Sequence, residues 1–194
     1  MNALEAVVLA AGAGVRFGGD KLTAPRAGGV LLASALAAAF AAPARAVTVV
    51  WGADPAVPET ARRLAGQSGQ TARLRLVHNP DHAEGMGASL RAGVAALPAD
   101  SSGVFVFLGD MPRVPHAIAG QLADSLTRGS AVAPLHGGRR GHPVLFDAAL
   151  LPPLLASTGD QGAGRLLASL GDRLVLVTTD DDGVLFDVDT RSDP

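Results

Sequence analysis

The chain has 194 residues, of which 48% are hydrophobic and 18% charged, and we expect residues 1–194 to fold as a single domain without crosslinks. It contains no cysteine, which excludes disulfides and thiolate metal sites, so any metal must be bound through oxygen or imidazole. A net charge of −2, no basic run longer than Arg139-Arg140 and an aromatic content of 4% argue against a nucleic-acid partner, and no long apolar stretch predicts a membrane span.

The sequence opens with an acidic residue, Glu5, and a short apolar stretch, which is unlike a secretory signal, so we expect a cytoplasmic protein. Short apolar runs then alternate with segments of helical character, a pattern typical of a parallel sheet covered by helices. The predicted strands are 6–10, 46–51, 75–78, 103–108, 130–133 and 174–178. The predicted helices are 31–42, 59–67, 88–97, 115–127 and 162–170. The apolar residues 7–9 and 104–108 predict two neighbouring central strands.

Small residues follow the first predicted strand, and two cations follow them. Small side chains let backbone N–H groups approach an anion. The forked guanidinium of Arg16 and the mobile ammonium of Lys21, the only lysine in the chain, suit a triphosphate. The residues of this predicted phosphate-binding loop are Leu9, Ala10, Ala11, Gly12, Ala13, Gly14, Arg16 and Lys21.

Two other glycine-rich loops do not match this segment. A dinucleotide fingerprint has a third glycine where this sequence has Phe17, and it needs an acidic residue about twenty positions later that is missing here. A Walker A loop needs Gly-Lys-Ser/Thr, whereas this chain has Asp20-Lys21-Leu22. The loop is therefore of neither type.

Carboxylates follow two apolar segments that read as strands. Asp110 comes directly after the strand predicted at 103–108, at the edge of an open α/β sheet where ligands bind, and it could hold Mg²⁺ or simply cap a turn before Pro112. In the strand-like segment 184–190, Asp187 and Asp189 lie two residues apart on one face. Either of them could supply a second metal ligand, or both could belong to a solvated edge.

Three further segments have glycines and polar residues at predicted loops. Residues 79–91 lead from a strand end to a helix start, a position that attracts anions. We regard His78 and His82 in this region as bystanders, because Pro80 between them argues against a helix. The segment 137–141 is predicted to be a mobile loop, and the segments 140–143 and 159–165 could hold an acceptor phosphate or merely end secondary structure.

Together these segments resemble the MobA-like NTP transferase family, and within it the molybdenum cofactor cytidylyltransferases. The resemblance extends over nearly the whole chain. The matching segments are 9–12, Arg16, Lys21, Asn79, 84–90, 108–112, 141–143 and 187–190. The opening Leu-Ala-Ala-Gly is that of the cytidylyltransferases, and the distinction from the guanylyltransferases rests on Ala11.

The resemblance implies a Rossmann-like three-layer α/β sandwich with a mostly parallel central sheet, of the nucleotide-diphospho-sugar transferase type. It implies that the first loop, Arg16 and Lys21 bind the triphosphate of CTP. The residues expected to cradle base and ribose are Asn79, Gly85, Met86, Gly87 and Ser89. Asp110 with Asp187 or Asp189 is expected to bind Mg²⁺. The residues expected to face the acceptor, molybdopterin carrying molybdenum, are His142, Asp160 and Gly162.

From this we predict transfer of CMP from CTP to the acceptor phosphate, with Arg16, Lys21 and Asp110 in catalytic roles and a client molybdoenzyme as a further partner. A phosphate nucleophile is already ionised near neutral pH, so no general base is required. Three alternatives stay open: a guanylyltransferase, a sugar-phosphate nucleotidyltransferase on the same scaffold, and a non-catalytic protein that delivers nucleotide or cofactor.

Overall fold

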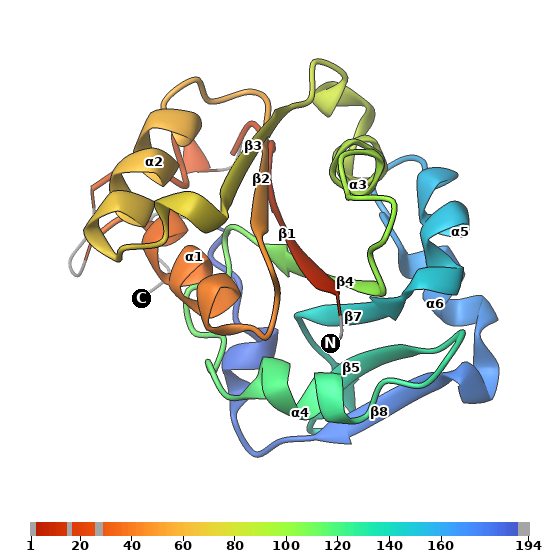
Figure 1. Ribbon diagram of the computed structural model, residues 1–194. Coiled ribbons are helices and arrows are strands. Elements are labelled where there is room, and N and C mark those ends of the chain that lie inside the picture. Colours follow the sequence, from red (N-terminus) through yellow and green to blue (C-terminus); the bar gives the residue numbers. More distant parts are fainter. Residues whose placement is uncertain (1–2, 15–16, 26–28, 190–194) are drawn as a thin grey trace.

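An eight-stranded sheet runs through the computed structural model, which describes residues 3–14, 17–25 and 29–189 (Figure 1). The strand order is β3-β2-β1-β4-β7-β5-β6, and β8 pairs with β5 outside this path. The strands are β1 (Leu4–Ala10), β2 (Val47–Trp51), β3 (Leu74–His78), β4 (Gly103–Leu108), β5 (Ala131–His136), β6 (Arg139–Arg140), β7 (Val144–Asp147) and β8 (Leu174–Thr178). The helices are α1 (Leu31–Ala41), α2 (Val57–Gln67), α3 (Met86–Ala95), α4 (Ile118–Asp124), α5 (Leu151–Leu155) and α6 (Gly164–Ser169).

The centre of the sheet is the parallel pair β1 and β4, whose register places Val7 opposite Val106. Both residues are buried, as expected for strands with apolar side chains on both faces. The prediction that these two strands are neighbours is confirmed. Because β1, β2, β3 and β4 are all parallel, their carboxyl ends lie at one edge of the sheet, and we refer to it as the carboxyl edge.

Helices cover both faces of the sheet (Figure 1). One apolar cluster joins one face to α1, α2 and α4, and a second joins the opposite face to α3, α5 and α6. The predicted three-layer α/β sandwich with a mostly parallel sheet is therefore confirmed. Within the described part of the chain, no helix combines the length and the apolar character that a membrane crossing requires.

The elements β6, β7 and α5 were not predicted from the sequence. The segment 137–141, expected to be a mobile loop, contains the tight turn of a hairpin between β5 and β6. Gly137 and Gly138 both have positive φ, +55° and +77°, which suits the two central positions of a type I′ turn. After this hairpin, β7 enters the sheet antiparallel to both β4 and β5 and separates them.

The strand-like character predicted for 184–190 is also wrong. The structure has a 3₁₀ turn at Asp182–Leu185, and the residues that follow, up to Asp189, form neither helix nor strand. The carboxylate of Asp181 accepts the amide of Gly183 at 2.8 Å, which starts the turn. Gly183 also lies against the carbonyl of Arg113, where a side chain would collide. Local capping therefore overrides the β propensity of this apolar run.

Candidate active site

The first loop leaves β1 at the carboxyl edge and folds back on itself at Gly14. Gly14 has a φ of +57°, and its carbonyl oxygen accepts hydrogen bonds of 2.9–3.2 Å from the amides of Phe17, Gly18 and Gly19. A Cβ atom at Gly14 would lie 2.9 Å from the Cβ atom of Lys21. Glycine therefore allows both the left-handed backbone and the close passage of Lys21.

Hydrogen bonds attach both this loop and the end of β1 to neighbouring segments. The amide of Gly109, just after β4, donates to the carbonyl of Leu9 at 2.9 Å. The hydroxyl of Thr23 donates to the carboxylate of Asp54, three residues beyond β2, at 2.6 Å. Arg16, predicted to bind phosphate, lies outside the described residues.

The side chains of Lys21, Asp110 and Asp189 meet at the carboxyl edge, and we refer to them as the charged cluster. Lys21 Nζ lies 2.8 Å from Asp110 Oδ2 and 3.8 Å from Asp189 Oδ1. The Lys21 side chain is 11% exposed, whereas those of Asp110 and Asp189 are 30% and 50% exposed. The structure thus brings the loop after β1 and the carboxylate after β4 together, and their role in binding a triphosphate and a metal ion stays a prediction.

The segment that carries Asp187 and Asp189 lies against Asp110. The amide of Val188 donates to the backbone carbonyl of Asp110 at 3.1 Å, and Val188 itself is fully buried. Both flanking residues, Asp187 and Asp189, are exposed. Only Asp189 approaches the Lys21 ammonium, while Asp187 lines a hollow of about 220 Å³ that it shares with residues of the β6–β7 region.

Asp110 and Asp189 form a donor set that suits a divalent cation. Mg²⁺ is commonly held by one or two carboxylates, with water and phosphate oxygens completing its octahedron. Among residues 3–14, 17–25 and 29–189, no group of three or more histidine, aspartate or glutamate side chains could hold a metal ion. The two carboxylates therefore suit a metal ion whose remaining ligands come from water and a bound polyphosphate.

The loop between β3 and α3 is organised around Asn79, which is 3% exposed. Its Nδ2 donates to Ser89 Oγ at 3.1 Å, and its Oδ1 accepts the amide of Asp81 at 3.1 Å. Ser89 is also buried. Since both polar atoms of the Asn79 side chain already have partners, this geometry favours a role in shaping the loop.

Two glycines at the start of α3 allow this loop to contact the segment 158–160. A Cβ at Gly85 (φ +103°) would collide with the Asp160 carboxylate, and a Cβ at Gly87 would lie 2.7 Å from the carbonyl carbon of Thr158. The amide of Gly87 donates to the carbonyl of Gly159 at 2.8 Å. The segments around residues 85 and 159, distant in sequence, therefore form one unit.

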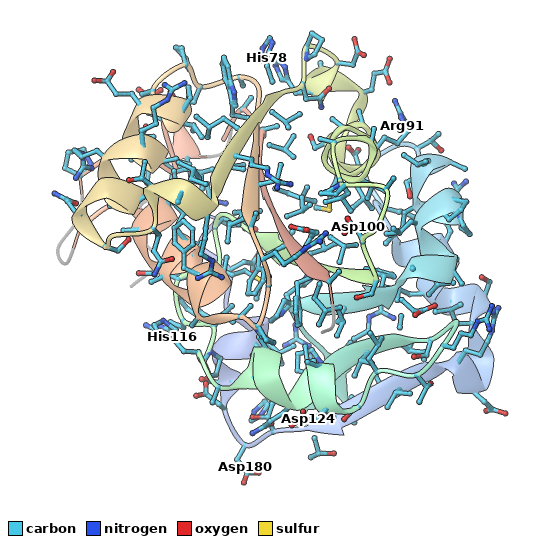
Figure 2. All side chains as sticks on the ribbon, viewed as in Figure 1. His78, Arg91, Asp100, His116, Asp124 and Asp180 are labelled. Atoms are coloured by element: carbon cyan, nitrogen blue, oxygen red, sulfur yellow. The ribbon has the colours of Figure 1, made fainter. Side chains whose placement is uncertain are left out.

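Arg91 holds the same two segments together and was not among the predicted site residues. One of its terminal nitrogens donates to the Ser157 carbonyl at 2.6 Å, and the other donates to the Glu84 carboxylate at 3.0 Å. Figure 2 shows Arg91 on the side of α3 that faces α5. A lone arginine on a helix gives no sequence signal for such a contact.

A cavity of about 90 Å³ opens between the sheet, α3 and α6, and we refer to it as the apolar cavity. Its apolar lining includes Leu9, Leu90, Val106, Val144, Phe146 and Leu167. His142 also lines it, and among the described residues Nδ1 of its ring has no hydrogen-bond partner. Burial lowers the pKa of His142 below its usual value, so the imidazole is neutral at neutral pH.

The three predicted acceptor-binding residues surround the start of α3. His142 lines the apolar cavity directly. Gly162 (φ +51°) lies next to Met86, whose sulfur would be 3.1 Å from an added Cβ, and Met86 is 41% exposed at the cavity. Asp160 is exposed and contacts Gly85. The structure thus brings these residues together, although their role stays a prediction.

The β7 side chains Val144 and Phe146 form part of the cavity wall and were not predicted. The short apolar run directly after Pro143 was the only available signal. A second unpredicted feature is a ring contact between Trp51 at the end of β2 and His78 at the end of β3, whose ring centroids are 4.3 Å apart. Figure 2 labels His78 at this end of the sheet.

Comparison with known proteins supports a common family. Residues 6–174 match the MobA-like NTP transferase domain. The chain is 29% identical over 193 residues to the molybdenum cofactor cytidylyltransferase of Escherichia coli, with 100% of this chain and 94% of that protein covered. It is 31% identical to the nicotine blue oxidoreductase of Paenarthrobacter nicotinovorans, covering 95% and 91%. A solved nucleotidyl transferase from Methanothermobacter thermautotroptrophicus superposes with a TM-score of 0.77 at 25% identity, covering 100% and 94%.

Proposed function

The chain belongs to the MobA-like NTP transferase family and is a nucleotidyltransferase, and on this premise we propose that it transfers CMP from CTP to molybdopterin carrying molybdenum, with release of pyrophosphate. The full-length similarity to a molybdenum cofactor cytidylyltransferase supports the choice of acceptor. The Leu9-Ala10-Ala11-Gly12 opening supports CTP over GTP.

The charged cluster is the observation that carries the proposal. Lys21 comes from the loop after β1, Asp110 follows β4, and Asp189 comes from the C-terminal segment, so three distant parts of the chain place charges at one point. This point lies at the carboxyl edge, where open α/β sheets bind ligands. A phosphate chain bound by the first loop would lie beside these charges.

In the proposed reaction, a terminal phosphate oxygen of the acceptor attacks the α-phosphorus of CTP. A new P–O bond forms, the bond from the α-phosphorus to the oxygen that bridges it to the β-phosphorus breaks, and pyrophosphate leaves with that electron pair. Lys21 and Arg16 neutralise charge on the phosphate oxygens, which is the main catalytic contribution in such transfers. Asp110 and Asp189 would hold Mg²⁺, which would supply further charge neutralisation at the phosphates.

The apolar cavity supports an acceptor with a flat heterocyclic part. Aliphatic and aromatic side chains line it, and the neutral His142 contributes a ring nitrogen that has no hydrogen-bond partner within the described part of the chain. A cavity of about 90 Å³ is smaller than a whole substrate, so the acceptor would also use the adjoining hollow of about 220 Å³. Leu108, Arg140 and His142 line both spaces. In this arrangement Arg140 would meet the anionic end of the acceptor.

The decisive experiment measures pyrophosphate release from CTP, GTP and UTP with Mg²⁺, with and without molybdenum-loaded molybdopterin. We expect release with CTP that depends on the acceptor. Preference for GTP would indicate a guanylyltransferase, and turnover of UTP with a sugar phosphate would indicate a sugar-phosphate nucleotidyltransferase. Nucleotide binding without pyrophosphate release would indicate a non-catalytic carrier. Each of these results would contradict the proposal.

A further inference from the structure

The ammonium of Lys21 lies where the proposed function, on which this inference rests, requires a metal ion. It is 2.8 Å from Asp110 Oδ2 and 3.8 Å from Asp189 Oδ1, so a cation already approaches both carboxylates. The Lys21 side chain is 11% exposed and the least exposed of the three. In the structure, Lys21 thus occupies the cation position of the charged cluster.

Binding of a divalent cation at this position is unfavourable while the ammonium stays in place. The cluster contains two carboxylates, and the Lys21 ammonium lies within 3.8 Å of both. A metal ion bound to Asp110 would stand within a few ångströms of a like charge that is largely shielded from solvent, where repulsion is weakly screened. Lys21 and the metal therefore compete for the same carboxylates.

Lys21 carries its ammonium on a flexible four-carbon stem, so the ammonium can move without a shift of the backbone. Its neighbour Leu22 is buried, and the Leu22 carbonyl accepts the amide of Leu32 at 3.1 Å, which anchors the chain at the base of the side chain. The stem of Lys21 passes directly over Gly14. A lysine stem is flexible, so its ammonium can turn from Asp110 toward a phosphate bound by the small residues after β1.

We propose that Lys21 acts as a stand-in cation that excludes free divalent metal from Asp110 and Asp189 until a nucleoside triphosphate draws its ammonium away. Metal and nucleotide then bind cooperatively, each raising the affinity of the other. The triphosphate binds to the loop after β1, and the Lys21 ammonium moves to it. The carboxylates of Asp110 and Asp189 then bind the metal ion that accompanies the triphosphate. The protein would consequently not retain metal between turnovers.

The test compares Mn²⁺ binding by the wild-type protein and Lys21→Met without nucleotide, using the electron paramagnetic resonance signal of free Mn²⁺. We expect Lys21→Met to bind Mn²⁺ at least tenfold more tightly, although the same variant should be catalytically impaired. In Lys21→Met/Asp110→Asn, this gain should disappear. Arg113→Met is the matched control, because it removes one positive charge from an exposed side chain that stacks on Phe186, and its Mn²⁺ affinity should equal that of the wild type.

Lys21→Arg provides a second variant that keeps the charge. Its guanidinium can hold the carboxylates through two nitrogens, so Mn²⁺ binding without nucleotide should be weaker than in the wild type. Unchanged or weaker Mn²⁺ binding in a folded Lys21→Met protein would overturn the inference, as would a Lys21→Arg protein that binds Mn²⁺ more tightly than the wild type.

A further titration separates this inference from the proposed function. Adding CTP should raise the Mn²⁺ affinity of the wild type by at least tenfold and that of Lys21→Met by much less. If no nucleoside triphosphate changes Mn²⁺ binding in the wild type, the cooperative part of the inference is refuted. A tighter Mn²⁺ site in Lys21→Met, together with pyrophosphate release from an NTP other than CTP, would refute only the choice of CTP and leave the stand-in role supported.

Discussion

The charged cluster and the apolar cavity lie at the same edge of the sheet but are built in different ways. The cluster consists of three charged side chains. Lys21 lies in the loop after β1, Asp110 lies just after β4, and Asp189 lies in the C-terminal segment. The cavity is a packed surface shared by central strands, α3, α6 and β7. On the proposed function, the cluster would serve any nucleoside triphosphate, whereas the cavity would select the acceptor.

The largest effect that this comparison predicts is on the rate of Lys21→Ala. Loss of the cation at the phosphates should lower pyrophosphate release by roughly 10²–10³-fold, whichever acceptor is supplied, because charge is stabilised mainly in the transition state. Circular dichroism should show an intact fold. Turnover close to that of the wild type would show that Lys21 has no catalytic role. A defect limited to one acceptor would show that the charged cluster, and not only the apolar cavity, discriminates between acceptors.

The next prediction concerns the packing beside the cavity. Gly87→Ala would place a methyl group 2.7 Å from the Thr158 backbone, and we expect it to cost about 1–3 kcal/mol of unfolding free energy by forcing the two segments apart. Gly120→Ala, in α4, is the matched control, because nothing lies within 4 Å of the added atom. The control should be neutral or stabilising by up to about 1 kcal/mol. Equal urea midpoints for the two variants would contradict the close contact between Gly87 and the Thr158 backbone.

A smaller effect is expected from Arg91→Ala. The variant loses hydrogen bonds to the Ser157 carbonyl and to Glu84, and the unfolding free energy should fall by about 0.5–1.5 kcal/mol. Because Arg91 connects the segments around 84–87 and 157–160, the KM for the acceptor should rise while the rate at saturation changes little. A change in the KM for the nucleotide alone would show that Arg91 belongs functionally with the charged cluster.

The smallest expected effect is on the pH dependence of stability near neutrality. Burial lowers the pKa of His142 in the folded protein, so the unfolded state binds a proton more readily. The stabilising contribution is therefore complete above the unfolded-state pKa of about 6.5 and is lost as the pH falls below it. Urea unfolding at pH 7.5 and pH 6.0 should show a smaller drop for His142→Gln than for the wild type. Identical drops would indicate that His142 titrates normally.

The meeting of Lys21 and Asp110 was predictable from sequence because each follows an apolar run that forms a parallel strand, and parallel strands end at a common edge. Asp110 after β4 and Lys21 after β1 illustrate this rule. The cavity was not predictable in the same way. Val144 and Phe146 lie in a strand of four residues that follows Pro143, too short for periodicity to distinguish from a loop.

The sequence also could not decide whether Asp187 or Asp189 lies near Lys21. Both residues are exposed, and only the distance of 3.8 Å between Asp189 Oδ1 and Lys21 Nζ shows which of them lies near Lys21. The secondary structure predicted for the C-terminal segment was wrong for a related reason. Its apolar residues suggested a strand, but Asp181 caps a 3₁₀ turn whose side-chain hydrogen bond is weakly encoded in the sequence.

The ring contact at the ends of β2 and β3 gives the protein a natural optical reporter. Trp51 is the only tryptophan in the chain, and it stacks on His78 three residues before Asp54, which holds Thr23 of the first loop. Its emission therefore comes from a single known place, linked through Asp54 to the first loop. Ligand-induced movement of that loop could be followed in stopped-flow experiments on the unlabelled protein.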